Sequence, residues 1–339
     1  MRKFVLITFT LLISFSTIPT FAIENGTSAL GDQRAIHIYT NRMTDQGYKT
    51  WVGGCSAWLY SPRIVLTSAH CVHDDQIRPR VEALKPEDIR VGKPGVREDN
   101  QEILMEVVQV FTPKTFQWYV ANVGGTLSFK DDFAALVLKS DLSEIKPAKL
   151  ATKELLDSLV EKGALVSNVG YGFQSSDRSF NQHREPKYAK YSMITFSEGM
   201  KKVNEYKSKW SRNFFQEDAY FMRVDSKRGS PCDGDSGSGY YIEEKGVYTY
   251  LGPMHSPIGT SNCGMQTADS DAIATLLPVY VYSNYVTEAE NYVKNNPSPS
   301  AQKDLKNLPR VIKCKKGSNI KKVFGKNPKC PAGFKLMKV

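Results

Sequence analysis

The stretch VGGCSAWLYSPRIVLTSAHC, residues 52–71, reads as two β-strands separated by the turn residues Ser-Pro-Arg. Its apolar and β-branched residues favour strands, and the Ser-Pro pair favours a break between them. Similar short segments recur along the chain, divided by Gly, Pro and Asn. They are EILMEVVQVF at 102–111, FAALVL at 133–138, ALVSNVGYGF at 164–173, AYFMRV at 219–224, GSGYYIE at 237–243 and GVYTYLGPM at 246–254. This pattern predicts an all-β sandwich or barrel.

The remaining segments predict loops, one helix and a linker. Residues 73–100 are polar and dotted with Pro and Gly, so we expect them to be rich in loops. NYVTEAENYVKNN at 284–296 predicts an amphipathic helix near the end of the folded domain. The Ser/Pro-rich run after it predicts a linker at 297–305. We therefore expect one domain over 23–296 and a small separate segment at the C-terminus.

The positive charge of the chain is concentrated at its C-terminal end. The 339 residues carry a formal net charge of +10, with 41% hydrophobic and 24% charged residues. Residues 301–339 hold 12 Lys or Arg and one acid, whereas the first 300 residues hold 33 and 34. This composition supports a packed core and excludes global disorder. Because the main domain is nearly neutral, it also argues against nucleic-acid binding by the whole protein.

Residues 1–22 have the features of an export signal. Arg2 and Lys3 precede the apolar run FVLITFTLLISFS, and Thr20 and Ala22 place small residues at positions −3 and −1 of a cut after Ala22. The alternative is a membrane anchor, but this run is shorter than the roughly 20 residues that span a bilayer. We predict a cleaved signal peptide, a secreted or periplasmic protein, and no transmembrane segment after the cut.

The cysteines predict disulfide bonds rather than a metal site. There are six, and an even number behind an export signal is typical of a disulfide framework, although fifteen pairings are possible in principle. They are Cys55, Cys71, Cys232, Cys263, Cys314 and Cys330. No Cys-x-x-Cys pair or Cys/His cluster with zinc spacing occurs, so we expect no metal and no other cofactor.

Three segments contain residues suited to nucleophilic catalysis. LTSAHC contains His70, DDFAALVL begins with Asp131 and Asp132, and PCDGDSGSG contains Ser236 in a Gly-rich turn. A serine hydroxyl needs a base to take its proton as it attacks, and histidine is suited because its pKa lies near the working pH. A buried carboxylate orients the imidazole and stabilises its charged form. Glycines accept backbone angles that point N–H groups at a developing oxyanion.

These segments, in this order, resemble the chymotrypsin/trypsin-like serine protease family. TSAHC is similar to the family's general-base motif, which implies that His70 is the base. GDSG is similar to the nucleophile motif, which implies Ser236 as nucleophile and the N–H groups of Gly234 and Ser236 as the oxyanion hole. DFAAL is similar to the family's Asp-apolar-Ala-x-Leu strand, which implies that Asp132, and not Asp131, orients the histidine.

The resemblance covers about residues 23–296. It implies an all-β, two-barrel chymotrypsin-like fold with a C-terminal helix, followed by a small basic appendage. The opening stretch is similar to the family's strand–turn–strand before the general base, including a disulfide that would join Cys55 to Cys71. Cys232 and Cys263 fall where the family links the nucleophile loop to the wall of the specificity pocket, which implies a second disulfide.

The chain departs from the family where the substrate groove is expected. Family members often have Ser-Trp-Gly after the nucleophile, in a stretch that lines the groove and backs the triad carboxylate, whereas this chain has GPMHSPIG. Either His255 or Ser256 replaces part of that stretch, or His255 is an ordinary loop or strand-end histidine. The other histidines have no motif around them, and we expect them at the surface. They are His37, His73 and His183.

The residue six before the nucleophile bears on specificity. In the family this position lies at the base of the specificity pocket, where Asp selects Arg or Lys; here it is Ser230. A Lys or Arg side chain would lose water there without gaining a partner. We therefore expect a preference for aromatic or large apolar side chains before the bond that is cut.

The N-terminus left by signal cleavage resembles that of an activated family member. IENG is similar to the family's Ile-Val-Gly-Gly start, and no residue lies between the expected cut and Ile23. In the family, the freed α-amine inserts and pairs with the Asp before the nucleophile, here Asp235, and this pairing forms the pocket and the oxyanion hole. We hypothesise that removal of the signal peptide is also the activating cut.

The C-terminal segment 306–339 is Lys-rich and contains Cys314 and Cys330. A disulfide between them would enclose about 15 residues and contribute roughly 3 kcal/mol through loop entropy. The segment is similar to short basic C-terminal segments of exported bacterial proteins. It is either a solvated appendage or a docking tag for anionic surfaces such as cell-wall polymer, lipopolysaccharide, anionic lipid or nucleic acid.

These features together predict an exported, monomeric serine endopeptidase that acts on protein or peptide substrates. Peptide bonds would be hydrolysed through an acyl-enzyme on Ser236, with His70 as base and Asp132 as its orienting group. The alternative is a non-catalytic, protease-like binding or adhesion protein that acts through the basic tail. Loss of a triad residue usually marks such proteins and none is lost here, but the unusual groove strand leaves this alternative open.

Overall fold

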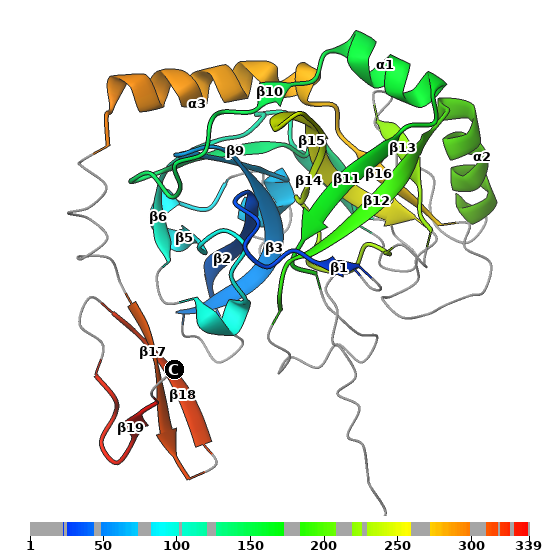
Figure 1. Cartoon of the computed structure of the whole chain (residues 1–339). Coiled ribbons are helices and arrows are strands. Elements are labelled where there is room, and N and C mark those ends of the chain that lie inside the picture. Colours follow the sequence, from blue (N-terminus) through cyan, green and yellow to red (C-terminus); the bar gives the residue numbers. More distant parts are fainter. Residues whose placement is uncertain are drawn as a thin grey trace, which may run out of the picture.

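The computed structural model contains two β-barrels side by side and a small C-terminal sheet (Figure 1). The structure describes residues 23, 26–43, 49–73, 83–101, 104–120, 127–172, 184–207, 219–225, 229–258, 272–298, 310–317, 319–325 and 329–337. The expected all-β, two-barrel architecture is confirmed.

Six antiparallel strands close the first barrel. Around the ring they are β2 (Ala35–Met43), β3 (Lys49–Ser61), β4 (Ile64–Thr67), β9 (Ala134–Leu138), β6 (Met105–Phe111) and β5 (Ile89–Val91). Successive residues of a strand point to opposite faces, so Ala57 and Leu59 of β3 join the core of this barrel, whereas Trp58 and Tyr60 join the core shared with the second barrel. The strand predicted from the opening stretch therefore serves both cores.

Six further strands close the second barrel. Around the ring they are β12 (Lys187–Ile194), β11 (Leu165–Gly170), β14 (Gly239–Glu244), β15 (Val247–Ile258), β16 (Ile273–Leu276) and β13 (Tyr220–Arg223). The ring closes where Met222 of β13 lies opposite Met193 of β12. Two short strands extend it: β1 (Thr27–Ser28) pairs with β12, and β10 (Lys149–Leu150) pairs with β15.

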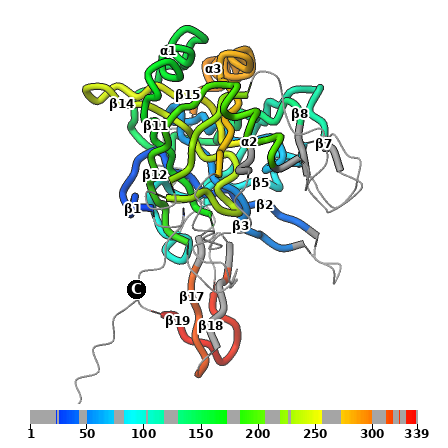
Figure 2. Tube along the Cα trace, turned by 90° about the vertical axis from the view of Figure 1, so that its right-hand side faces the viewer, coloured from blue at the N-terminus to red at the C-terminus, as the bar shows by residue number. Residues whose placement is uncertain are grey.

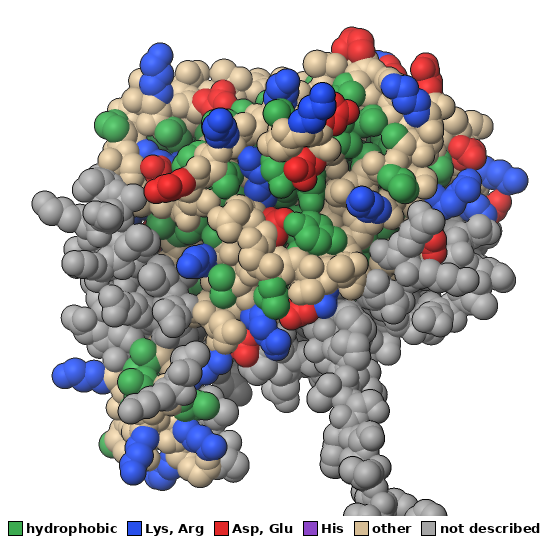
Figure 3. All heavy atoms as spheres, viewed as in Figure 1, with side chains coloured by type: hydrophobic (Ala, Val, Ile, Leu, Met, Phe, Trp, Pro, Cys, Tyr) green, Lys and Arg blue, Asp and Glu red, His purple; other side chains and the backbone are tan. Residues whose placement is uncertain are grey.

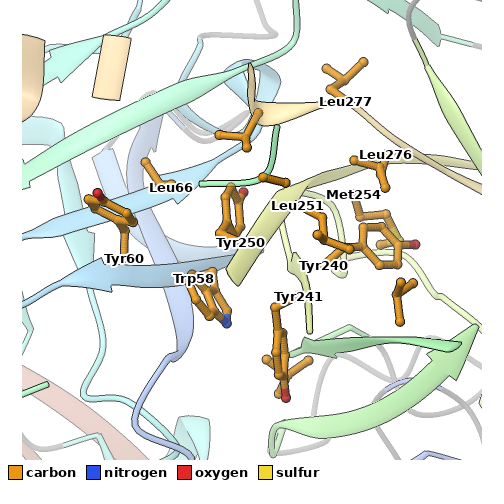
Figure 4. Packing of buried hydrophobic residues seen from close by; sticks show 14 of the residues in the cluster. Trp58, Tyr60, Leu66, Tyr240, Tyr241, Tyr250, Leu251, Met254, Leu276 and Leu277 are labelled. Atoms are coloured by element: carbon orange, nitrogen blue, oxygen red, sulfur yellow. The ribbon is translucent and has the colours of Figure 1, made fainter. Parts of the chain in front are cut away.

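Aromatic side chains join the two barrels (Figure 4). Trp58 is fully buried and stacks on Tyr250 and Tyr241 of the second barrel, with ring centroids 5.0 and 5.6 Å apart. Aromatic rings of this size remove a large apolar area from water, so these contacts contribute strongly to the association of the barrels. Because residues of the candidate site come from both barrels, this packing also fixes their separation.

Short helices surround the barrels in the described part of the chain. They are α1 (Lys153–Glu161), α2 (Phe196–Lys207), α3 (Ser283–Asn295), and the 3-10 helices η1 (Ala69–Val72), η2 (Pro86–Asp88), η3 (Glu98–Asn100) and η4 (Val279–Tyr282), with the hairpin β7 (Gln117–Val120) and β8 (Leu127–Lys130). The helix predicted at 284–296 is α3. The strand pattern does not predict α1 or α2. None of the helices in the described ranges is long and apolar enough to cross a membrane.

The second predicted strand of the opening stretch ends earlier than expected. We predicted that it continues through His70, but β4 ends at Thr67 and His70 lies on η1. The His70 N–H donates to the side chain of Asp132 at 2.8 Å, so a carboxylate takes the place of a strand partner. The change from strand to 3-10 helix thus occurs where the candidate site begins.

The C-terminal segment forms a three-stranded sheet closed by a disulfide. β18 (Asn319–Gly325), β17 (Arg310–Lys316) and β19 (Lys335–Leu336) pair in that order. The predicted bond between Cys314 and Cys330 is present. Figure 2 shows this sheet projecting from one end of the barrels. Lys313 Nζ of β17 lies 3.7 Å from an oxygen of Asp99 in η3, which joins the sheet to the first half of the chain.

Candidate active site

His70 and Asp132 form a hydrogen-bonded pair between the barrels. His70 Nδ1 lies 2.7 Å from Asp132 Oδ2, and the His70 backbone N–H donates to Asp132 Oδ1 at 2.8 Å. The Asp132 side chain is fully buried, whereas 14% of the His70 side chain is exposed. An imidazole that is held on one edge by a buried carboxylate and accessible on the other is arranged to act as a general base.

The pairing of β4 with β9 places these two residues together. Thr67 lies opposite Ala134, so the chain leaves β4 toward His70 beside the point where it enters β9 from Asp132. The preceding residue, Asp131, has a φ of 53°, and its Oδ1 accepts a hydrogen bond from the Tyr282 hydroxyl at 3.3 Å. The structure therefore brings Asp132, and not Asp131, to His70.

Asp132 is ionised at neutral pH despite its burial. Burial opposes the charge, but the imidazoles of His70 and His255 and their hydrogen bonds hold the pKa of this carboxyl well below its usual range. An ionised carboxylate can only accept hydrogen bonds, so Nδ1 of His70 carries the proton. Nε2 is then the ring atom that can take a proton from a nucleophile.

Ser236 lies on a turn beside His70. The Ser236 carbonyl oxygen accepts the Ser56 N–H at 3.0 Å and lies 3.6 Å from Cys71 Sγ. The same sulfur lies 3.7 Å from Nε2 of His70. Cys71 therefore contacts both the predicted nucleophile residue and the predicted base, so the third candidate segment lies beside the other two.

Two glycines allow the turn to adopt its shape. Gly234 has a φ of +92° and Gly237 a φ of +78°, which L side chains rarely adopt. A Cβ at Gly237 would lie 2.0 Å from Thr67 Oγ1, so only glycine lets the turn approach β4 this closely. Within the described residues, no hydrogen bond occupies the N–H group of Gly234 or Ser236. Both are therefore available as the predicted oxyanion donors.

A second imidazole contacts the same carboxylate. His255 Nδ1 lies 3.0 Å from Asp132 Oδ2, and His255 is only 5% exposed. His255 therefore lies near the end of a strand, as one interpretation of the sequence expected, but its contact with Asp132 agrees with the other interpretation, in which it backs the triad carboxylate. It lies on β15 behind the candidate triad, while the side chain of Ser256 is outside the described part of the structure.

Asp235, next to the predicted nucleophile, is a fully buried carboxyl group. Its oxygens accept the N–H groups of Gly172 at 2.7 Å and Cys232 at 2.9 Å. No ion pair joins it to another of the described residues. Burial raises the pKa of Asp235 to about 7, and the two hydrogen bonds and the more distant charge of Arg184 offset this only in part.

Ile23 contacts the segment that leads to the predicted nucleophile, and Ser230 lies in that segment. Ile23 is fully buried, and a Cβ at Gly229 would lie only 2.9 Å from Ile23 Cγ2. Ser230, the expected base of the specificity pocket, follows this contact and is partly buried. Residues 259–271, on which the expected pocket wall falls, are outside the described residues, and Cys263 is among them.

The cysteine predictions are confirmed where the structure describes both partners. Cys55 is bonded to Cys71. Cys232 is also disulfide-bonded, but its expected partner Cys263 is outside the described ranges. Donor atoms of Cys55, His70 and Cys71 lie within 4.8 Å of one another, the spacing of a metal site. Both sulfurs are bonded to each other, however, so this group offers no thiolate ligand.

The expectation that the other histidines lie at the surface is wrong for two of them. His37 and His73 are fully buried. The ring of His37 stacks on Tyr171 with centroids 5.1 Å apart, and His73 Nδ1 donates to the Ala69 carbonyl at 2.6 Å. Each ring is buried because it packs against another group and forms hydrogen bonds. These contacts arise in the folded chain, so a search for sequence motifs does not predict them. His183 lies outside the described residues.

Sequence reasoning also missed two residues that support the nucleophile turn. Ser56 Oγ accepts the Tyr171 N–H at 2.7 Å and donates to the Gly234 carbonyl at 2.8 Å. Arg184 is buried, donates to the Gly53 carbonyl at 2.9 Å and lies against Gly234, where a Cβ would be 3.1 Å from its Nη1. Ser56 lies in the opening stretch and Arg184 in no motif, but the hydrogen bonds that both form depend on the folded chain.

Comparison with known families agrees with this geometry. The chain matches the family described as Trypsin over residues 39–284, which is more than half of its length. A search of curated proteins finds no match. The matched range contains both barrels except the first residues of β2, and the segments that carry His70, Asp132 and Ser236. The chain therefore belongs to the trypsin family.

Proposed function

We propose that this protein is an exported serine endopeptidase. The observation that carries the proposal is the position of His70. The buried Asp132 carboxylate binds its Nδ1, and Cys71 contacts both its Nε2 and the turn that carries Ser236. Membership of the trypsin family supports a hydrolase of the serine protease type. The export signal predicted at residues 1–22 and the disulfides support an oxidising compartment outside the cytosol.

The reaction would proceed through an acyl-enzyme. Nε2 of His70 takes the hydroxyl proton of Ser236 as Oγ attacks the scissile carbonyl carbon, and Asp132 stabilises the imidazolium that forms. The N–H groups of Gly234 and Ser236 stabilise the oxyanion. The imidazolium then gives its proton to the leaving amine as the C–N bond breaks. A water deprotonated by His70 attacks the ester, releases the acid and restores the serine hydroxyl.

A protein hydrolysis assay tests this function. The chain processed to begin at Ile23 should cleave casein at internal bonds, and Ser236→Ala should lower the rate by about four orders of magnitude or more, because the acyl-enzyme cannot form. Ser143→Ala, which changes an exposed hydroxyl, serves as the matched control and should retain activity. Equal cleavage by the Ser236→Ala protein would contradict the proposal.

The neutral residue Ser230 suggests which side chain is accepted before the cut bond. If Ser230 lies at the pocket base, a cationic side chain would be desolvated there without a partner. We infer a preference for aromatic or large apolar side chains. Peptides that differ only at this position should give the highest kcat/KM with Phe, Tyr or Leu, whereas a clear preference for Arg or Lys would overturn the inference.

We also propose that the α-amine of Ile23 activates the enzyme by pairing with Asp235. Support comes from the state of Asp235, a buried carboxyl group with a raised pKa and no cationic partner among the described residues. A cation placed beside the Asp235 carboxyl group would favour its ionised form, because the ion pair would offset the free-energy cost of burying the charge. The side chain of Ile23 is already buried near the segment leading to the nucleophile.

For the C-terminal sheet we propose a role in docking to anionic polymers. Its register places Lys315 opposite Lys335, and like charges directly across a sheet are destabilising. A bound polyanion would relieve this repulsion. Lys315 and Lys335 are exposed, and blue side chains gather on this part of the molecule in Figure 3. The alternative, a non-catalytic, protease-like binding or adhesion protein, is less well supported because the triad residues are retained.

A further inference from the structure

The carboxylate of Asp132 is bound by two imidazoles at one oxygen. Oδ2 lies 2.7 Å from Nδ1 of His70 and 3.0 Å from Nδ1 of His255, while Oδ1 accepts the backbone N–H of His70 at 2.8 Å. The carboxylate can only accept, so both imidazoles present an Nδ1–H to it. Three hydrogen bonds from two sides therefore fix both of its oxygens.

An irregularity in β15 turns His255 toward Asp132. Along the pairing of β15 with β16, Met254 lies opposite Leu276 but Pro257 lies opposite Ala274, so β15 contains one extra residue between these pairs. Such a bulge re-aims the side chains of the strand, and bulges are common beside active sites. His255 lies within this bulge.

The residue before His255 is attached to the other two catalytic segments. The Met254 N–H donates to the Ser238 carbonyl at 2.7 Å, and the Met254 carbonyl accepts the Gly237 N–H at 3.0 Å. The same carbonyl accepts the Ser68 hydroxyl at 3.0 Å. One short stretch of β15 therefore contacts the nucleophile turn, the segment that leads to His70, and, through His255, the carboxylate.

We propose that His255 is a positioning residue for catalysis, holding the Asp132 carboxylate in the orientation that directs His70 toward Ser236. This inference rests on the proposed function, and it concerns a residue that never touches the substrate. His255 donates to the second lone pair of Oδ2, so the carboxylate cannot rotate away from His70. Loss of this donor would leave His70 Nδ1 as the remaining imidazole partner of the buried, charged Oδ2, so the carboxylate would be held less firmly and could turn.

Among the described residues, the charged and titratable groups that act on Asp132 are the two imidazoles, His70 from η1 and His255 from β15. Because both bind the same oxygen, they compete for its electron density. Replacing His255 should therefore change the chemical shift of the Nδ1 proton of His70, even though one ring lies on η1 and the other on β15. A histidine that merely filled space at this position would produce no such effect.

Two variants separate positioning from packing. His255→Asn keeps an N–H donor close to the position of Nδ1, whereas His255→Leu keeps the bulk and removes the donor. In the processed enzyme with a peptide ester substrate, we expect the Leu variant to lower kcat by about 10- to 100-fold, the effect of losing one hydrogen bond to a charged group. KM should stay within about 2-fold, and the Asn variant should recover most of kcat.

A second readout does not depend on turnover. Proton NMR of the wild type should show two downfield Nδ1–H signals, and His255→Leu should remove one and shift the other, which belongs to His70. His37→Asn, which replaces a buried imidazole on β2 that stacks on Tyr171, should leave both signals in place. An unchanged His70 signal in the Leu variant, or equal kcat for the Leu and Asn variants, would overturn the proposal. A shifted signal in a protein without hydrolytic activity would support the positioning role while refuting the peptidase.

Discussion

At the scale of single residues, two fully buried aspartates behave in opposite ways. Asp132 has a pKa below the usual range because two imidazoles and their hydrogen bonds outweigh the cost of burial. Asp235 has only two backbone donors and a distant arginine, so burial dominates and raises its pKa to about 7. The neighbours, and not the depth of burial, decide which carboxylate is charged at neutral pH.

The raised pKa of Asp235 predicts an unusual pH dependence of stability in the uncut protein. Between about pH 4 and pH 7 the folded state keeps a proton that the unfolded chain has released. The free energy of unfolding should therefore fall as the pH rises through this window. Urea unfolding of the uncut protein at several pH values would measure this slope, and Asp235→Asn should flatten it because it cannot ionise.

The neighbouring acid gives a control for this measurement. Asp233 is exposed, so Asp233→Asn should leave most of the slope in place. In the processed protein the pairing with Ile23 should lower the pKa of Asp235, so this fall in the free energy of unfolding should become smaller or disappear. An equal slope in the wild type and the Asp235→Asn protein would show that this carboxyl group is ionised in both states.

At the scale of structural elements, the nucleophile turn depends on glycine at position 237. A Cβ there would lie 2.0 Å from Thr67 Oγ1 and 2.6 Å from the Ser56 carbonyl oxygen. Gly246 offers a matched comparison, because it has the same φ of +78° but no atom within 4 Å of a Cβ. We expect Gly246→Ala to cost about 1–2 kcal/mol from backbone strain alone.

Gly237→Ala should cost clearly more than Gly246→Ala and should also displace Ser236. Denaturant unfolding of the two variants measures the difference in stability. The rate of acylation by a nitrophenyl ester measures the effect on the nucleophile. Similar stabilities and acylation rates for the two variants would mean that the turn tolerates a side chain toward β4.

The same scale shows what the sequence could predict. The short strands, the C-terminal helix, two disulfides and the pairing of His70 with Asp132 follow from local patterns and from the family resemblance. The bulge that aims His255 does not, because it depends on how β15 pairs with β16. Neither do the burial of His37 or the bonds of Ser56, because they depend on partners distant in the sequence.

At the scale of the whole molecule, the N-terminus is predicted to act as a switch. A chain that begins Met-Ile23, with the Met retained, cannot place the Ile23 α-amine beside Asp235. Because breaking a buried ion pair costs about 3–5 kcal/mol, we expect this chain to be roughly 100- to 5000-fold less active than one that begins at Ile23. Hydrolysis assays on both chains test this, and equal activity would refute activation by signal removal.

The basic tail is expected to act separately from the peptidase. A chain that ends at residue 300 lacks the Lys-rich sheet but keeps both barrels. It should retain peptidase activity and lose salt-sensitive retention on polyphosphate-coated beads, because the positive charge lies in the removed part. Unchanged retention would show that the tail is not the docking element.

The central claim is that Ser236 is an activated nucleophile. Reaction of the processed protein with a fluorophosphonate probe, followed by mass spectrometry of its peptides, tests this most directly. We predict one covalent adduct, located on Ser236, which His70→Ala slows strongly because the base is lost. A folded, correctly processed protein in which Ser236 stays unlabelled would contradict the account and favour a binding protein built on the same fold.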